Sequence, residues 1–410
     1  MKRLSWTQLF QAKEKKEGVA QADIFLMDDL LYDLWALGRN IILVWAPCNK
    51  GMDLLVIPHY AVGEIISDTK RSSGDGDSGF KTYLHKIVSG PKMIPNERLE
   101  HAARLLNTRP LHIDLPFTPG EGLDQETIDS LVKRYSITLV EDRAVALFDI
   151  VGFSHYSPLE QVTQLNSLSY SVNVAYSKLM DLDVEIRFAR TNTGDGFYIW
   201  NRDRGVHSNV DLYHFMHLVL AENAIARNKV QENTVPLLRT CFHVGGHYEF
   251  YQSEGLNPTT FSYIVGDVTI ELARMSENAR RGQILMGDFH TPMYDPDAGD
   301  WIAVDTIDFI GRSQKRLSRL NDLVLGGDNI SDIRCYLTGE KGRGDRYKIN
   351  RYLLSDKHGY TRRVFNAKVN IHRKKHPSIY LGLQGNTLSD FGISLDSIEP
   401  TSFMAGDTSQ

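Results

Sequence analysis

Two aspartates, Asp149 and Asp195, are the residues whose types and surroundings most clearly suggest chemistry. Asp149 lies near the end of the apolar run RAVALFDIVGF (143–153), and Asp195 lies in the turn sequence TNTGDG (191–196). If the strands that carry them are neighbours in one sheet, the two carboxylates meet at one point. Paired carboxylates suit hard cations such as Mg²⁺ or Mn²⁺, and two such ions could activate an attacking hydroxyl and neutralise a leaving diphosphate.

A purely structural explanation of this pair stays open. Asp-Gly is a common hairpin turn, and an aspartate at the end of a strand can cap the chain there. For Asp195-Gly196 alone the turn is the more common explanation, so a metal site depends on what the neighbouring sequence adds.

The segment after Gly152 predicts a helix that follows the first strand. Ser157, Pro158 and Glu160 have the form of a helix start, because serine can cap, proline suits the first helical position and glutamate completes a capping box. The apolar residues behind this start recur at spacings of three or four, or multiples of them, which predicts one apolar helix face. They are Leu159, Val162, Leu165, Leu168, Val172 and Leu179.

Short β-type runs predict the strands. DVEIRFAR (183–190) and FYIW (197–200) flank the hairpin signal at Asp195-Gly196. Near the N-terminus, IILVWA (41–46) and LLVIP (54–58) have the apolar, β-branched composition of buried strands. The fold class that follows is α/β (α+β).

Length and composition suggest several domains. A chain of 410 residues with 42% hydrophobic and 24% charged residues suits two or three globular domains. We expect an N-terminal α/β domain of unknown role (1–137), a domain that carries both aspartates (138–345) and a small β-rich C-terminal domain (346–410).

Several classes of protein are excluded or disfavoured. Three cysteines without a close pair exclude a disulfide scaffold or a zinc knuckle and suit a reducing cytoplasm. No run of eighteen apolar residues predicts a membrane span, and the N-terminus lacks the apolar region of a signal peptide. A net charge of −5 disfavours a protein that coats nucleic acid. We therefore expect a cytoplasmic protein without a membrane partner.

Four motifs occur in order over the middle of the chain: FDIVGF, RTNTGDGF, RTCFHVGG and YIVGDVTIELARM. They resemble the signature strands of the class III adenylate and guanylate cyclase family. The resemblance implies a ferredoxin-like catalytic core and an enzyme that closes a nucleoside triphosphate into a 3′,5′-cyclic monophosphate.

The same resemblance implies roles for individual residues. Asp149, Asp195 and the Ile150 carbonyl would hold two Mn²⁺ or Mg²⁺ ions. The other implied positions contact substrate. Backbone N–H groups at Phe153 and Ser154 would bind phosphate oxygens, Arg239 would bind the triphosphate, and Arg274 would stabilise charge on the transferring phosphorus. Arg343, in Lys341-Gly342-Arg343-Gly344, would contact a phosphate, although a surface turn explains this sequence equally well.

The family's active sites are shared between subunits. The metal ligands and the equivalent of Arg239 come from one subunit, and the equivalent of Arg274 comes from the other. One such domain in a chain implies a head-to-tail homodimer with two sites.

The positions that would read the base depart from the adenylate cyclase pattern. A lysine four residues before the hairpin aspartate is replaced by Thr191, and an Asp or Thr three residues before the later glycine is replaced by Tyr263. Because the adenine-reading pair is missing, adenine is disfavoured as the substrate base. Tyr263 either narrows the pocket toward a single-ring base, which favours CTP or UTP, or is an ordinary strand aromatic. Ile270 stands where the family has the asparagine that orients the ribose.

The C-terminal segment carries a basic block. Between Arg346 and His376 there are ten Lys or Arg and one acid, and from Gln384 onward there are four acids and no Lys or Arg. Residues 351–385 resemble the adenylyl/guanylyl and SMODS C-terminal sensor domain, especially at 355–359 and Phe365-Asn366. The basic face could hold an anionic or phage-derived trigger, although a solvated surface explains it as well.

Together, the altered base positions and this tail resemble the pyrimidine cyclases of the Pycsar antiphage system. That resemblance implies conversion of CTP or UTP to cyclic CMP or cyclic UMP plus diphosphate. A purine cyclase and, because of Ile270, a non-catalytic nucleotide-sensing domain remain the alternatives.

Overall fold

The computed structural model describes residues 19–61, 63, 83, 85–121, 123–230, 233–253, 260–339, 347–356, 359–388 and 391–398. These residues form two compact units. The N-terminal unit comprises residues 1–140 and 248–264, and the core unit comprises 141–247 and 265–410. Within the described ranges, no helix combines the length and hydropathy that crossing a membrane requires.

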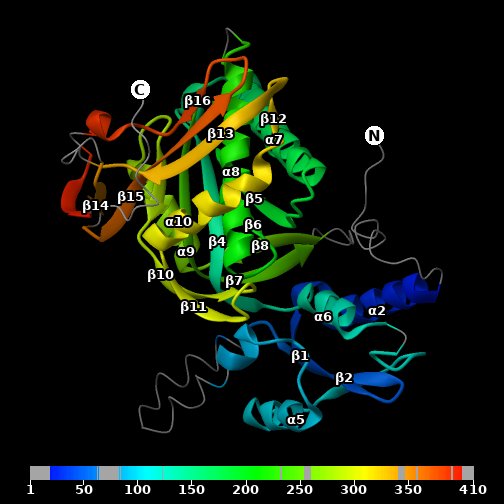
Figure 1. The fold of residues 1–410 in the computed structure, drawn as a ribbon. Helices are drawn as coiled ribbons and strands as arrows, with labels where there is room; N and C mark the ends of the chain where they lie inside the picture. The colour runs from blue at the N-terminus through cyan, green and yellow to red at the C-terminus, as the bar shows by residue number, and fades with distance from the viewer. Residues whose placement is uncertain are drawn as a thin grey trace. The chain divides into compact units, whose positions relative to one another are not determined.

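The core unit contains the predicted ferredoxin-like βαββαβ fold. Its strands lie in the order β7-β4-β6-β5, and β6 pairs antiparallel with both β4 and β5 (Figure 1). The ends that carry the two aspartates therefore belong to neighbouring strands. In chain order these elements are β4 (Thr138–Ile150), α7 (Pro158–Asp181), β5 (Phe188–Asn192), β6 (Gly196–Asn201), α8 (Val206–Arg227) and β7 (Leu238–Ser253).

The rest of the core unit extends this sheet, whose path continues from β7 through β9, β15 and β13 to β12. β9 runs parallel to β7 and antiparallel to β15. The remaining elements are α9 (Asp267–Asn278), β9 (Ile284–Gly287), β10 (His290–Asp295), β11 (Asp300–Asp305), α10 (Thr306–Arg316), β12 (Val324–Leu325), β13 (Asp328–Leu337), β14 (Ile349–Ser355), β15 (Thr361–Arg373), β16 (Ile379–Leu381) and β17 (Ile393–Ile398).

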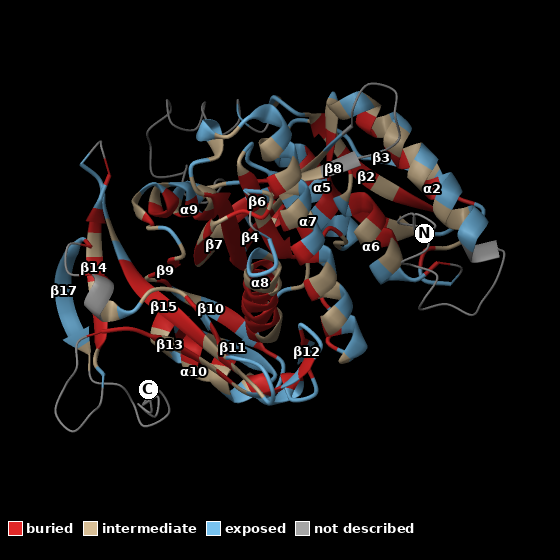
Figure 2. Cartoon of the chain, turned by 90° about the horizontal axis from the view of Figure 1, so that it is seen from above, coloured by how far each residue is buried: buried red, intermediate tan, exposed pale blue. Residues whose placement is uncertain are grey.

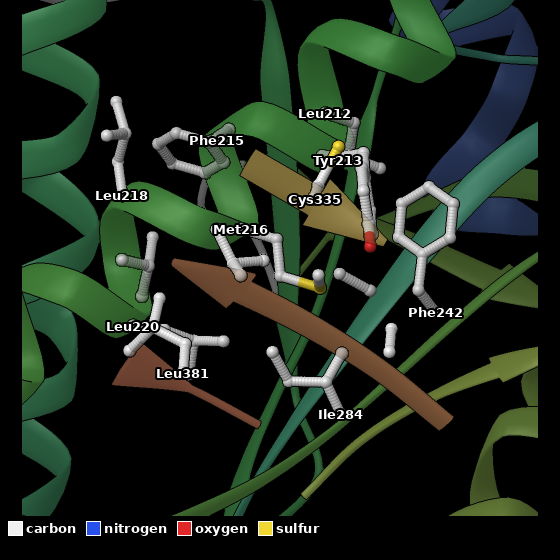
Figure 3. Close-up of a cluster of buried hydrophobic side chains, with 14 of the residues drawn as sticks. Leu212, Tyr213, Phe215, Met216, Leu218, Leu220, Phe242, Ile284, Cys335 and Leu381 are labelled. Atoms are coloured by element: carbon white, nitrogen blue, oxygen red, sulfur yellow. The ribbon is translucent and has the colours of Figure 1, made fainter. Parts of the chain in front are cut away.

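The C-terminal segment is part of the core unit. From the sequence we expected residues 346–410 to form a separate domain. β15 lies between β9 and β13 in the large sheet. Asn366 of β15 is fully buried and links the strands, because it accepts from Gln283 at 3.0 Å and donates to the Thr338 hydroxyl at 2.7 Å. Apolar residues of the segment also join the main core, and Figure 3 shows Leu381 beside Leu220 of α8.

Helix α8 is the centre of that core. Fifteen of its residues are buried, so it lacks the polar face of a surface helix (Figure 2). Its two buried histidines, His214 and His217, have pKa values lowered by burial, to about 3 for His214, and are neutral core residues. An element packed on all sides gives the sheet beside it a rigid support.

Two predictions about the elements need correction. The apolar face of α7 is buried at Leu168, Val172 and Leu179, but Leu159 and Val162 are 77% and 56% exposed. The apolar periodicity includes these two positions, but at the start of the helix the side chains are open to solvent. Residues 183–187, expected in a strand, lie outside β5, which begins at Phe188.

The N-terminal unit contains a three-stranded antiparallel sheet in the order β1-β2-β3, which includes both predicted strands. Two apolar clusters, one that includes Trp45 and one that includes Leu43, contain residues of this sheet. The elements are α2 (Val19–Trp35), β1 (Asn40–Cys48), β2 (Gly51–Pro58), α5 (Asn96–Leu105), β3 (Leu111–Asp114), α6 (Gln125–Lys133) and β8 (Thr260–Val265), of which β8 pairs with β7.

Candidate active site

Asp149 is a buried carboxylate near the end of β4, and it is 8% exposed. Arg239 of β7 donates to both of its oxygens, from Nε to Oδ1 at 2.8 Å and from Nη2 to Oδ2 at 3.3 Å. Ser276 of α9 donates its hydroxyl to Oδ2 at 2.9 Å. Three elements thus meet at this carboxylate, and the fork from Arg239 neutralises its charge.

Asp195 lies at the tip of the β5–β6 hairpin, as the Gly-Asp-Gly sequence predicts. The turn is closed by the Thr193 N–H, which donates to the Gly196 carbonyl at 3.0 Å, and Gly194 has a φ of +99° that a side chain would strain. The Asp195 side chain is half-buried and accepts from the Thr193 hydroxyl at 3.3 Å.

The two aspartates are brought together by strand pairing. Asp149 lies directly opposite Gly196, the residue after Asp195, and the Ile150 N–H donates to the Asp195 carbonyl at 2.9 Å. The backbones of the two aspartates therefore adjoin at the end of the β4–β6 pair. Gly196 permits this approach, because a Cβ there would meet the Phe148 carbonyl oxygen.

Tyr198 of β6 lies on the same face as Asp149, since it opposes Leu147 two residues earlier in β4. Burial raises the pKa of Tyr198 to about 12, with further contributions from the charges of Cys241, Asp149 and Asp195. Its hydroxyl donates to the Thr269 carbonyl at 3.1 Å.

The turn between β4 and α7 is a short 3₁₀ helix, Phe153–His155, entered through Gly152 at a φ of +70°. Ser154 is exposed and Phe153 packs partly against the core. The predicted capping box is confirmed, with the Ser157 hydroxyl accepting from the Glu160 N–H at 3.4 Å and the Glu160 carboxylate accepting from the Ser157 N–H at 2.8 Å.

Arg274 and Ser276 both belong to α9, but Ser276 is the residue that hydrogen-bonds to Asp149. Residues advance by about 100° along a helix, so side chains two positions apart point to nearly opposite sides. Arg274 instead pairs with buried Asp356, from Nε to Oδ2 at 3.7 Å, and lies 5.3 Å above the Tyr360 ring. A second ion pair supports this contact, because Arg362 bridges Asp356 at 3.3 Å and Glu271 at 2.7 Å.

The positions predicted to read the base lie in different units. Thr191 of β5 is half-buried opposite Tyr198 in the core unit. Tyr263 belongs to the N-terminal unit, where its ring stacks on Phe250 with centroids 5.8 Å apart. Ile270 is 47% exposed on α9. Arg343 and Lys341 lie outside the described residues.

On β7, Cys241 is buried and His243 is half-buried. Burial lowers the pKa of His243 to about 4 and raises that of Cys241. Both side chains are therefore uncharged at neutral pH, which suits residues that pack in the sheet.

Sequence reasoning missed three contacts of this site, from Ser276, Tyr198 and Asp356. Ser276 lies in the same helix as Arg274, but only the tertiary packing of α9 on β4 shows which side of the helix meets Asp149. Asp356 was read as part of a basic tail, although its ion pairs to Arg274 and Arg362 make it part of the core unit.

The basic block of the C-terminal segment is partly engaged in such pairs. Arg351 bridges Asp288 at 3.2 Å and Asp396 at 2.9 Å, and burial lowers the pKa of Lys368. Arg373 donates to the Pro377 carbonyl. The exposed positive charge of this segment is therefore smaller than the sequence count suggests.

The oxygen atoms of the site fit a divalent cation. Two carboxylates and a strand-end carbonyl are hard donors of the kind that Mg²⁺ and Mn²⁺ prefer. In the structure Arg239 supplies the positive charge beside Asp149, so binding of a cation there requires this fork to release one or both oxygens.

Comparisons with known proteins place cyclase domains among the similar structures. No family profile and no curated protein matches the chain. The solved structures include the guanylate cyclase domain of RhGC from Catenaria anguillulae in complex with GTP, at 12% identity over 58% of this chain and 100% of that chain with a TM-score of 0.32. They also include the adenylyl cyclase CyaB from P. aeruginosa (10%, 57% and 95%, TM-score 0.31) and adenylate cyclases from Trypanosoma brucei (10%, 56% and 88%, TM-score 0.29).

Proposed function

We propose that this protein is a nucleotidyl cyclase of the class III type. The observation that supports the proposal is the adjacency of the Asp149 and Asp195 backbones at the end of the β4–β6 pair in a ferredoxin-like core. In the reaction, the 3′-hydroxyl oxygen of the substrate bonds to the α-phosphorus while the bond from that phosphorus to diphosphate breaks. Such a step needs positioning and charge neutralisation more than a protein nucleophile.

The residues of the site take complementary parts in this proposal. Asp149, Asp195 and the Ile150 carbonyl hold two divalent ions, which when bound polarise the hydroxyl and the phosphate oxygens. Arg239, once released from Asp149, can turn to the triphosphate, and Ser276 keeps the Asp149 carboxylate oriented. The turn at Phe153 and Ser154 presents backbone N–H groups to phosphate oxygens.

The opposite orientations of two side chains on α9 support a shared site. Because Ser276 faces Asp149, Arg274 points away from the metal ligands of its own chain. An arginine so placed can stabilise the transferring phosphorus only in the site of a second copy, and a two-fold dimer gives two such sites.

The proposed substrate is CTP or UTP, and the proposed role is second-messenger synthesis in antiphage defence. Thr191 cannot supply the cationic donor that a lysine would give to adenine. Tyr263, stacked on Phe250, is an aromatic surface suited to a single-ring base. The exposed part of the basic C-terminal block is the proposed contact for an anionic or phage-derived trigger.

The direct test is to incubate the purified protein and Mn²⁺ with each of ATP, GTP, CTP and UTP and to identify the products by chromatography. We expect cyclic CMP or cyclic UMP plus diphosphate. Asp195→Asn should be inactive, and Asp181→Asn, an exposed aspartate at the end of α7, should match the wild type. Cyclic product from ATP or GTP alone would reject the pyrimidine proposal and retain the cyclase.

A non-catalytic nucleotide sensor is the second candidate, favoured by Ile270 at the ribose position and by the closed Arg239–Asp149 pair. Nucleotide binding measured by calorimetry, with no product from any of the four substrates and with the same affinity in Asp195→Asn, would support the sensor over the enzyme.

A further inference from the structure

A second group of potential metal ligands lies in the N-terminal unit, on one face of its small sheet. Cys48 ends β1, Asp53 lies in β2 and His112 lies in β3. Asp53 is opposite His112 in the β2–β3 pair, and Cys48 is opposite Gly51 in the β1–β2 pair. Because side chains two residues apart in a strand share a face, all three project to the same side.

Gly51 is what lets these side chains meet. A Cβ at this position would lie 3.0 Å from the Cε1 atom of His112 and 2.5 Å from the Ile113 carbonyl oxygen. The imidazole therefore lies over the bare backbone of Gly51 and reaches across β2 toward Cys48. The Leu115 N–H donates to the Lys50 carbonyl at 2.9 Å and holds the end of β3 against this turn.

The imidazole of His112 is surrounded by three groups that can be anionic. Nδ1 lies 2.8 Å from Asp53 Oδ1 and 3.7 Å from Cys48 Sγ, and Nε2 lies 3.4 Å from Asp114 Oδ1. If the ring proton is on Nε2, facing Asp114, then Nδ1 has no hydrogen. Its lone pair faces the Asp53 carboxylate oxygen at hydrogen-bond distance. Two acceptors at that distance require a cation between them, either a proton or a metal ion.

The electrostatics of the cluster also favour a cation. The Asp53 and Asp114 carboxylates bring two negative charges to the His112 ring. Among the described residues, His112 is the only cationic group within ion-pair distance of either aspartate.

We propose that Cys48 Sγ, Asp53 Oδ1 and His112 Nδ1 bind a divalent transition-metal ion of the Zn²⁺ type. A thiolate, an imidazole and a carboxylate are ligands that zinc accepts together, and three protein ligands leave a fourth position for water. Asp114 orients the ring through Nε2, the usual carboxylate partner of a ligating histidine. This site is independent of the proposed cyclase function.

The spacing of the ligands agrees with this assignment. Tetrahedral zinc places a thiolate sulfur and an imidazole nitrogen about 3.5 Å apart, and Cys48 Sγ lies 3.7 Å from His112 Nδ1. The separation of Nδ1 from Asp53 Oδ1 would increase from 2.8 Å to about 3.3 Å on replacing a shared proton by the ion.

A cysteine nucleophile activated by His112 is the competing explanation of the same geometry. An activated thiol needs a lowered pKa, usually from a neighbouring cation or a helix N-terminus. Here Asp53 and Asp114 place carboxylates on both ring nitrogens of His112, and such acidic surroundings disfavour a free thiolate nucleophile.

The test is a titration of the purified full-length protein with Co²⁺, a spectroscopic substitute for zinc, under reducing conditions. We expect one equivalent to produce a sulfur-to-cobalt charge-transfer band in the near ultraviolet and visible bands of tetrahedral intensity, whatever cobalt binds at the oxygen ligands of the candidate active site. Zn²⁺ should displace the cobalt. Cys48→Ser should lose the charge-transfer band, and His112→Ala should weaken binding by more than about 100-fold, beyond the loss of an outer partner.

Two further variants separate the site from general effects. Asp114→Asn should bind cobalt about 10- to 100-fold more weakly with an unchanged spectrum, because it removes only the partner of Nε2. His290→Gln, an exposed histidine of β10, should match the wild type. Circular dichroism of each metal-free variant verifies folding, and Asp53→Asn replaces any variant that does not fold. Equal cobalt affinity in the wild type and in Cys48→Ser or Asp53→Asn would overturn the proposal.

Discussion

At the scale of single residues, the two aspartates of the candidate active site differ in their surroundings. Asp149 is buried and holds Arg239 and Ser276, whereas Asp195 is half-buried in a turn with one local hydrogen bond. Removing one partner of a buried ion pair leaves the other charge uncompensated, which is costly. The same substitution at the two positions should therefore affect stability differently.

We expect Asp149→Ala to lower the free energy of unfolding by about 1–3 kcal/mol, reduced from the fully buried case because Arg239 is partly exposed. Asp195→Ala should change it by less than about 0.5 kcal/mol. Both should abolish cyclic nucleotide formation. Urea unfolding and product assays on the two variants check this, and equal destabilisation would contradict the described role of Asp149.

Lys92 gives the N-terminal unit a pH dependence of its own. It is fully buried, donates to the Ile137 carbonyl at 2.8 Å, and burial lowers its pKa from 10.5 to about 7, against an opposing effect of Asp129. Between these values the unfolded chain binds more protons than the folded one, so the contribution of Lys92 to stability rises with pH from about 7 to about 10.

In Lys92→Met this rise should be absent, since the side chain no longer titrates. Urea unfolding followed by tryptophan fluorescence at about pH 7 and pH 10 compares the two proteins. If the midpoints of wild type and variant shift in parallel over this range, the lysine is not titrating as its burial requires.

At the scale of elements, the local signals in the sequence were reliable and the tertiary ones were not. The capping box at Ser157 and the hairpin at Asp195 depend on residues within a few positions of one another, and both are present. The exposure of Leu159 and the contact of Ser276 with Asp149 depend on which elements pack together, which no local pattern encodes.

The C-terminal segment shows the same limit at larger separation. Its basic block suggested a separate domain, but β15 pairs with β9 and β13 inside the large sheet. Asp356, at the end of β14, thereby reaches Arg274 of α9. The segment that resembles a sensor is thus in contact with the arginine proposed to act on the transferring phosphorus.

Asp356→Asn should lower kcat by about 10-fold and leave KM nearly unchanged, because Arg274 acts on charge that develops in the transition state. The asparagine carbonyl can still accept from the Tyr360 N–H, so the turn is retained. Asp396→Asn, which removes an exposed partner of Arg351, is the matched control and should leave kcat unchanged. An increase in KM with constant kcat would show that Arg274 needs no such positioning.

At the scale of the whole molecule, the proposed dimer can be tested by complementation. Asp195→Ala and Arg274→Ala should each be nearly inactive alone. After subunit exchange, a heterodimer has one site with both defects and one with neither, so random mixing should restore about a quarter of wild-type activity. Size-exclusion chromatography verifies exchange of tagged subunits. No recovery after verified exchange would place Arg274 in the site of its own chain.

The course of the chain between the two units has a practical consequence for dissecting them. The chain leaves the core unit after His247 and returns at Val265. Within the core unit the backbones of Gly266 and His247 are in contact, because a Cβ added to Gly266 would lie 2.7 Å from the His247 Cα. Deleting residues 1–140 alone would leave residues 248–264 without the rest of their unit. Excising both pieces and rejoining the chain through a linker of two or three small residues would yield a minimal core, and its turnover would reveal whether the N-terminal unit restrains or sustains the reaction.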